Sequence, residues 1–130
     1  MDSRSGSALT ALVVDDDEFS RASLSEMLTS LGIARVDLAD NGRTALKRLR
    51  QAGTAPDVLI CDIFMPDIDG IEFLNHLVER QYRGRVILVS GMDVQMIAMA
   101  SDIAASSNLN FLGAFLKPVP LDTLARALGL

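Results

Sequence analysis

Residues 9–18 have the sequence Leu-Thr-Ala-Leu-Val-Val-Asp-Asp-Asp-Glu, a largely apolar run that ends abruptly in four acidic side chains. A short run of this kind is typical of a strand buried on both faces of a parallel sheet. Apolar residues then recur at i, i+3, i+4 and i+7, which is the spacing of one helical face. These residues are Leu24, Met27, Leu28 and Leu31. Gly32 stands where that helix is expected to end.

The same unit of strand and helix repeats along the rest of the chain. Further strands are expected at 36–39, 58–61, 86–89 and 111–116, and helices at 42–52, 71–83, 92–106 and 121–128. This alternation predicts an α/β fold, with a parallel sheet covered by helices on both faces and right-handed connections. We expect residues 1–7, which are mostly small and polar, to form a flexible leader, and 8–130 to form one domain.

Composition excludes several classes of protein. The 130 residues are 49% hydrophobic and 22% charged, which is ordinary for a globular domain. No stretch approaches the roughly 18 apolar residues of a membrane span, so we expect a cytoplasmic protein with no membrane partner. The single Cys61 excludes an internal disulfide and a multi-cysteine zinc site. A net charge of −5 argues against direct binding of nucleic acid.

Polar side chains stand at the ends of four expected strands. Asp15 and Asp16 follow the first strand, Asp62 the third, Ser90 the fourth and Lys117 the fifth. Ligands bind outside the carboxyl ends of such strands, so these side chains are expected to converge. Converging carboxylates repel one another unless a cation lies among them, and oxygen ligands suit Mg²⁺. A lysine and a hydroxyl beside them would hold phosphoryl oxygens, so an aspartate is expected to act as nucleophile toward phosphorus.

The chain resembles the receiver domain of bacterial two-component response regulators. The motifs that carry the resemblance are Leu12-Val13-Val14-Asp15-Asp16, Asp62 with Met65-Pro66 and Asp69-Gly70, Ser90, and Lys117-Pro118, and they occur in the family's order. The resemblance implies a doubly wound five-stranded parallel sheet of strand order 2-1-3-4-5 with five helices, like flavodoxin and the chemotaxis regulators.

The resemblance also implies a role for each matching residue. Asp62 matches the phosphoacceptor, Ser90 the hydroxyl that moves toward the phosphoryl group, and Lys117 the lysine that pairs with it. The implied Mg²⁺ ligands are Asp15, Asp16, Asp62 and the backbone carbonyl of Met65. The Lys117–Pro118 bond is usually cis in this family.

As a function, the resemblance implies a signalling switch rather than an enzyme, with no catalysis beyond its own phosphoryl transfer and slow autodephosphorylation. A sensor histidine kinase or a phosphotransfer protein would phosphorylate Asp62. The helix at 92–106, the strand at 111–116 and the helix at 121–128 would then contact an output domain, a partner protein or a second copy of the chain. A looser likeness, carried by Ser90-Gly91-Met92-Asp93 and the long helix after it, is to receivers fused to EAL-type cyclic-di-GMP phosphodiesterases.

Several polar residues are expected to have purely structural roles. Asp17 and Glu18 lie in the first turn of a helix, where acidic side chains cap and stabilise it. Cys61 lies among apolar strand neighbours and is expected in the core. His76 is expected on a helix surface, because no second histidine or cysteine accompanies it.

Three further features of the sequence bear on how such a domain would work. Many receivers have an aromatic residue three positions before the lysine, where this chain has Ala114, and Phe115 should point to the opposite side of the strand. The expected helix at 92–106 carries one apolar stripe of Met92, Met96, Met99 and Ile103, which either packs in the core or forms a partner surface. At the pocket rim, Phe64 and Met92 cannot activate water, so slow loss of the phosphoryl group is expected.

Two alternative functions remain open at this level. A phosphatase of the haloacid dehalogenase type also forms an aspartyl phosphate, but it needs an acid two positions after the nucleophile, where this chain has Phe64. An unphosphorylated scaffold receiver is the other alternative, and failure to bind beryllofluoride with Mg²⁺ would support it.

Overall fold

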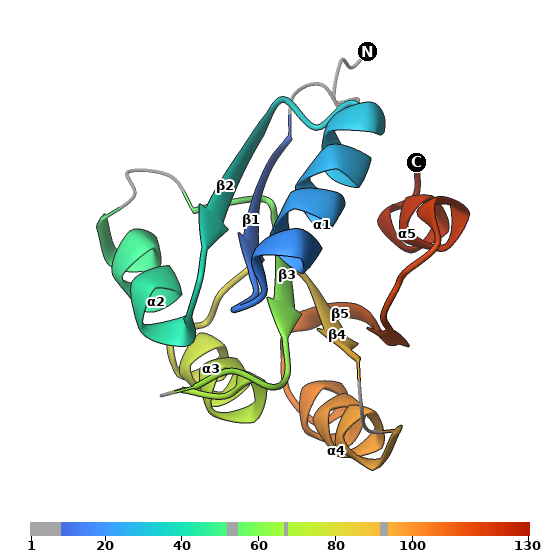
Figure 1. Ribbon diagram of the computed structural model, residues 1–130. Helices are drawn as coiled ribbons and strands as arrows, with labels where there is room; N and C mark the ends of the chain where they lie inside the picture. The colour runs from blue at the N-terminus through green and yellow to red at the C-terminus, as the bar shows by residue number, and fades with distance from the viewer. Residues whose placement is uncertain (1–8, 52–54, 67, 92–93) are drawn as a thin grey trace.

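Five parallel strands form one sheet in the order β2-β1-β3-β4-β5 (Figure 1). The computed structural model describes residues 9–51, 55–66, 68–91 and 94–130. The elements are β1 (Thr10–Val14), α1 (Glu18–Ser30), β2 (Arg35–Ala39), α2 (Gly42–Gln51), β3 (Val58–Asp62), α3 (Gly70–Glu79), β4 (Arg85–Ser90), α4 (Val94–Ala105), β5 (Asn110–Leu116) and α5 (Leu121–Leu128). The predicted fold class and strand order are therefore confirmed.

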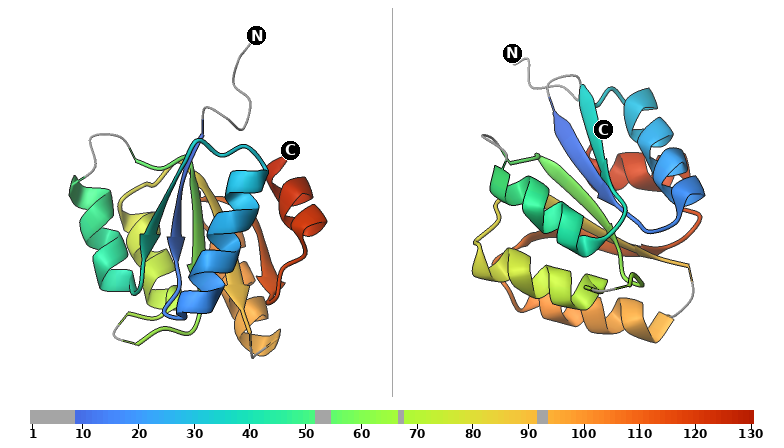
Figure 2. Two further views of the ribbon diagram at one scale, coloured as in Figure 1. Left: turned by 45° about the horizontal axis from the view of Figure 1, so that its top comes forward. Right: turned by 60° about the vertical axis from the view of Figure 1, so that its left-hand side comes forward.

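Helices cover both faces of the sheet, so the core has two halves. The views agree that α1 and α5 lie on one face, and that α2, α3 and α4 lie on the other (Figures 1 and 2). In β1, Val13 faces the α1 side while Leu12 and Val14 face the α3 side. Because both sides are covered, the strand is apolar at nearly every position, as the opening run indicated.

Most predicted boundaries agree with the structure within one or two residues. The third strand extends one residue beyond the prediction and includes Asp62, whose backbone therefore belongs to the sheet. Helix α1 ends at Ser30, and Gly32 follows with a φ of 93°, a conformation that favours glycine. The predicted leader at 1–7 and the predicted start of the fourth helix at Met92 lie outside the described residues.

Helix α4 does not bury the predicted methionine stripe as a whole. Met99 is 50% exposed, whereas Ala100 and Ala104 are buried against the sheet side. The small alanines allow the helix to approach its neighbours closely, and this rotation turns Met99 outward. Of the other stripe positions, Ile103 packs on the core, whereas Met92 and the side chain of Met96 lie outside the described part.

Strand β5 confirms the predicted alternation near the lysine. Phe115 packs in the half of the core beside α1 and α5, while Ala114 packs in the other half. The strand lies at the edge of the sheet, and its pairing with β4 shifts register between Val86 and Ile87. Among the described residues, no helix has the length and apolar character needed to cross a membrane.

Candidate functional site

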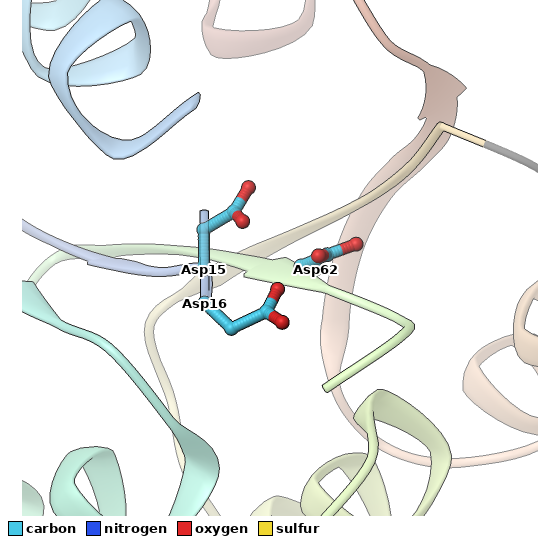
Figure 3. Close-up of side chains that lie close together, drawn as sticks. All are labelled: Asp15, Asp16 and Asp62. Atoms are coloured by element: carbon cyan, nitrogen blue, oxygen red, sulfur yellow. The ribbon is translucent and has the colours of Figure 1, made fainter. Parts of the chain in front are cut away.

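Three carboxylates meet at the carboxyl edge of the sheet. Asp15 and Asp16 follow β1, and Asp62 ends the neighbouring strand β3. One oxygen of each lies within 4.8 Å of the others, and Figure 3 shows the three side chains pointing into the same space. Asp15 and Asp62 are buried, while Asp16 is exposed, so the cluster is open to solvent on one side.

Lys117 lies beside the two buried carboxylates. Its Nζ is 2.9 Å from Oδ2 of Asp15 and 3.4 Å from Oδ2 of Asp62. The Lys117 backbone N–H donates to the carbonyl of Ser90 at 2.9 Å, which fixes the start of the loop after β5 against the end of β4. The ammonium group thus comes from a residue more than a hundred positions from Asp15 in the chain.

The other two predicted site residues, Ser90 and Met65, are also buried. Ser90 is the last residue of β4, in line with Leu116 at the end of β5, and is fully buried. Met65 lies in the segment between β3 and α3 and is 9% exposed. The structure therefore brings the predicted residues to one edge of the sheet, with direct contacts among Asp15, Asp62 and Lys117.

The charges at this edge shift the pKa values of Asp62 and Lys117. Burial, followed by the negative charge of Asp15, raises the pKa of Asp62 to about 7, although Lys117 opposes the rise. Burial alone would lower the pKa of Lys117, but its hydrogen bond to Asp15 and the charges of Asp62 and Asp15 outweigh burial, so this pKa is raised. Lys117 therefore keeps its positive charge, whereas Asp62 loses its proton only with difficulty when no further positive charge is present.

This arrangement fits a divalent cation. Three ionised carboxylates and one ammonium would leave a local charge of −2, which a divalent ion neutralises. The ligands are hard oxygens with an open, exposed side at Asp16, as suits Mg²⁺ with some of its waters retained. Among the described residues, this is the group of acidic, histidine or cysteine side chains that could hold a metal ion.

Local hydrogen bonds hold the acidic residues in place. Oδ1 of Asp15 accepts from the backbone N–H of Asp17 at 2.9 Å, and the backbone carbonyl of Asp15 accepts from Arg21 at 2.9 Å. Asp17 caps α1 by accepting from the backbone of Ser20, as predicted for this residue. The turn after β1 is therefore held through both the side chain and the backbone carbonyl of Asp15.

The start of α3 is pressed against the end of β3. A Cβ on Gly70 would lie 2.5 Å from Cα of Ile63 and 2.7 Å from the carbonyl oxygen of Asp62. Gly70 also donates to the carbonyl of Ile63 at 2.7 Å, and Asp69 caps the helix. The Asp69-Gly70 pair thus has a structural role, because only glycine permits the approach that holds Asp62 in position.

A hydroxyl group that sequence reasoning missed also contacts the site. Ser20 Oγ, in the first turn of α1, lies 3.3 Å from Nζ of Lys117. The sequence does indicate that Ser20 lies near the site, because it stands in the first turn of a helix that begins next to Asp15 and Asp16. The Lys117 contact itself could not be deduced, because it depends on how the loop after β5 returns toward α1.

Other residues singled out in the sequence have ordinary positions. Cys61 is fully buried, and burial raises the pKa of its thiol well above the usual value, so the predicted core role is confirmed. His76 lies on α3 with its Nδ1 4.0 Å from Glu79, as a surface imidazole. Phe64 is 39% exposed beside Asp62, to which its backbone N–H donates at 3.4 Å. The Lys117–Pro118 peptide bond is cis.

Comparison with known proteins gives a consistent result. The family model for the response regulator receiver domain matches residues 11–128. An uncharacterized response regulatory protein of Vibrio cholerae is 34% identical over 119 residues, which cover 91% of this chain but only 46% of that protein. The chemotaxis protein CheY of Bacillus subtilis is 30% identical over 117 residues, covering 90% of this chain and 92% of CheY.

A solved structure also resembles the chain. The complex of CheX, CheY, BeF3 and Mg²⁺ from Borrelia burgdorferi matches with a TM-score of 0.78 and 25% identity, covering 92% of this chain and 86% of the other. The present chain thus spans less than half of the Vibrio relative but nearly all of CheY. Taken with the strand order and the family model over residues 11–128, these matches establish that the chain belongs to the response regulator receiver domain family.

Proposed function

We propose that this chain is a phosphorylation-dependent signalling switch in which Asp62 accepts a phosphoryl group from a sensor histidine kinase or a phosphotransfer protein. The observation that carries the proposal is the position of Asp62. Its carboxylate lies within reach of Asp15, Asp16 and Lys117 at the open edge of the sheet. We also propose a cytoplasmic location, which is typical of receiver domains.

The proposed transfer is a displacement at phosphorus. An oxygen of Asp62 forms a bond to phosphorus as the bond from phosphorus to the donor histidine nitrogen breaks, and the imidazole leaves with the electron pair and takes up a proton. Lys117, 3.4 Å from Asp62, is in position to pair with a phosphoryl oxygen. Ser90 lies at the end of the adjacent strand, where a shift of its side chain would bring the hydroxyl toward the new group.

The proposed metal ligands are Asp15, Asp16, Asp62 and the backbone carbonyl of Met65. When bound, Mg²⁺ would supply positive charge that favours the ionised form of Asp62 and neutralises charge on the phosphoryl oxygens. The resemblance to a CheY structure that contains BeF3 and Mg²⁺ supports this assignment, since BeF3 with an aspartate imitates an aspartyl phosphate.

The two alternative functions, a phosphatase and an unphosphorylated scaffold, are not equally supported. Family membership and Phe64 at the position of the required acid both argue against a haloacid dehalogenase phosphatase. We propose that catalysis is confined to the domain's own phosphorylation and slow autodephosphorylation. The scaffold alternative is an outcome of the test below, because an intact set of side chains does not by itself establish phosphorylation.

The proposed output surface consists of α4, β5 and α5. Large apolar side chains are exposed on it: Val94 is 66% exposed, Met99 50%, Leu116 49% and Leu121 45%. Such exposure over neighbouring elements suits contact with an output domain, a partner protein or a second copy of the chain. The likeness to receivers fused to EAL-type phosphodiesterases stays a prediction about which output it serves.

Labelling with acetyl phosphate tests the proposal. Wild type with Mg²⁺ should gain one phosphoryl group, measured by intact-protein mass, and should bind beryllofluoride. Asp62→Asn should gain none, and excess EDTA should abolish labelling of wild type. Asp69→Asn is the matched control, because it also replaces a carboxylate by an amide nearby but keeps a helix cap. Undiminished labelling of Asp62→Asn would refute the assignment, and no labelling or beryllofluoride binding of wild type would favour the scaffold.

A further inference from the structure

We propose that Ser20 is a positioning residue, whose hydroxyl holds the Lys117 ammonium group at the site and so speeds phosphorylation of Asp62. The proposal rests on the proposed function, since it concerns the rate of that phosphorylation. None of the motifs that identified the family includes Ser20. The contact comes from the first turn of α1 and reaches across to the loop after β5.

The Lys117 ammonium group has as many nearby acceptors as it has N–H donors. A lysine ammonium has three N–H donors and no acceptor. Three acceptors lie near Nζ: Oδ2 of Asp15 at 2.9 Å, Oγ of Ser20 at 3.3 Å and Oδ2 of Asp62 at 3.4 Å. Two of these are carboxylates on the sheet, and Ser20 supplies the contact on the side of α1. Without it, the ammonium group keeps only its two carboxylate contacts and has no acceptor on the side of α1 among these three.

Residue Ser20 is anchored through its backbone. Its backbone N–H donates to Oδ2 of Asp17 at 2.8 Å, which anchors the residue at the start of the helix. The hydroxyl oxygen accepts a hydrogen bond from Lys117 Nζ at 3.3 Å, so the anchored start of α1 keeps this acceptor beside the ammonium group.

The surroundings explain why this contact matters for rate. Ser20 and Lys117 line a groove of about 380 Å³ between α1 and the loop after β5, and its walls are mostly apolar. The Lys117 side chain is only 18% exposed, so few water molecules can replace a lost acceptor. An ammonium that has lost this acceptor would be held less firmly and would be less often in position to pair with a phosphoryl oxygen arriving at Asp62.

A kinetic comparison tests the rate effect. In labelling by acetyl phosphate, the Asp62 oxygen bonds to phosphorus and acetate leaves with the electron pair of the broken bond. With Mg²⁺ present, Ser20→Ala should be labelled about fivefold more slowly than wild type, and Ser20→Thr, which keeps the hydroxyl, should recover most of the rate. Ser23→Ala is the matched control, because Ser23 lines the same groove one turn later. Its rate should stay within about twofold of wild type.

A second measurement observes Lys117 directly. The chain has two lysines, Lys47 and Lys117, so lysine labelled with ¹³C gives two resolved side-chain signals. Lys47 is exposed on α2 and serves as the internal mobile reference. Ser20→Ala should lower the order parameter of the Lys117 ε-carbon toward that of Lys47, whereas Ser23→Ala should not.

The outcomes separate this inference from the proposed function. Equal labelling rates and equal Lys117 order parameters in wild type and Ser20→Ala would overturn the inference while leaving Asp62 as phosphoacceptor. Slower labelling that Ser20→Thr does not recover, with Lys117 unchanged, would also overturn it, because it indicates only a disturbed helix start. Failure of wild type to be labelled at all would instead count against the proposed function.

Discussion

Replacing the central carboxylate by its neutral isostere should stabilise the fold when no metal is present. Asp62→Asn removes one of three negative charges held within 4.8 Å of one another. In the unfolded chain the pKa of an aspartate is near its ordinary value of 3.8, whereas burial and Asp15 raise the pKa of Asp62 to about 7 in the folded chain. The raised pKa means that the ionised form of Asp62 opposes folding.

The magnitude follows from that difference in pKa. Each pKa unit corresponds to about 1.4 kcal/mol, so the rise to about 7 sets an upper limit of about 4 kcal/mol. Side chains adjust and water enters from the open side at Asp16, so we expect about 2 kcal/mol. Because the folded chain binds this proton more tightly, the contribution of Asp62 becomes less favourable as pH rises from about 4 to 7. Above that window it stays at its least favourable value.

The assay is urea unfolding followed by circular dichroism in excess EDTA at pH 5 and pH 8. The free energy of unfolding of Asp62→Asn should exceed that of wild type by about 2 kcal/mol at pH 8 and by clearly less at pH 5. Asp69→Asn is the matched control, because it replaces a carboxylate that caps α3 and lies outside the acidic cluster. Saturating Mg²⁺ should stabilise wild type and reduce the gap. A wild type at least as stable as Asp62→Asn at pH 8 in EDTA, or a gap independent of pH, would refute this account.

Three further predictions concern other residues. Phe64→Asn and Met92→Glu should each speed loss of the phosphoryl group more than about 3-fold, because both introduce a side chain that can orient water. If time courses by intact-protein mass show neither effect, these two residues at the pocket rim do not control the lifetime of the phosphorylated state. Met99→Gln should weaken self-association or output docking, measured by sedimentation of the beryllofluoride-bound protein, and should lower the free energy of unfolding by less than about 0.5 kcal/mol. Ala100→Gln, at a buried position, is the destabilising comparison. Unchanged association of Met99→Gln would exclude Met99 from the proposed output surface. Tyr82→Phe removes a 2.6 Å hydrogen bond to a backbone carbonyl and should cost about 1–2 kcal/mol in urea unfolding while leaving labelling unchanged; no loss of stability would contradict the value assigned to this bond.

The strands and their polar ends could be predicted because each rule acts locally. Residues 58–61 are apolar at every position, as a strand covered on both faces requires, and Asp62 follows at the edge where parallel strands end. The period of two along a strand likewise sufficed to place Ala114 and Phe115 on opposite sides. In a strand, the position of a residue in the sequence directly determines the face on which its side chain lies.

The rotation of helices and the contacts of loops could not be predicted in this way. Helix α4 is apolar around much of its circumference, so the pattern alone did not say that Ala100 would face the core and Met99 the solvent. The contact of Ser20 with Lys117 depends on two segments far apart in the sequence and on the path of the loop after β5. Neither the rotation of α4 nor the Ser20–Lys117 contact produces a periodic pattern in the sequence, because both depend on how the helices, strands and loops pack together.

The place of Lys117 on the sheet has a consequence for local unfolding. Asp15 and Asp62 follow or end central strands, each hydrogen-bonded on both sides, whereas Lys117 follows β5, which lies at the edge and pairs through a register shift. Amide protons of a strand held on one side are expected to exchange with solvent sooner than those of central strands. A partial opening that frees only β5 and α5 would therefore leave the acidic residues in place without their counter-charge. If the proposed function holds, such an opening would impair phosphorylation of Asp62 while most of the hydrogen-bonded core was still intact.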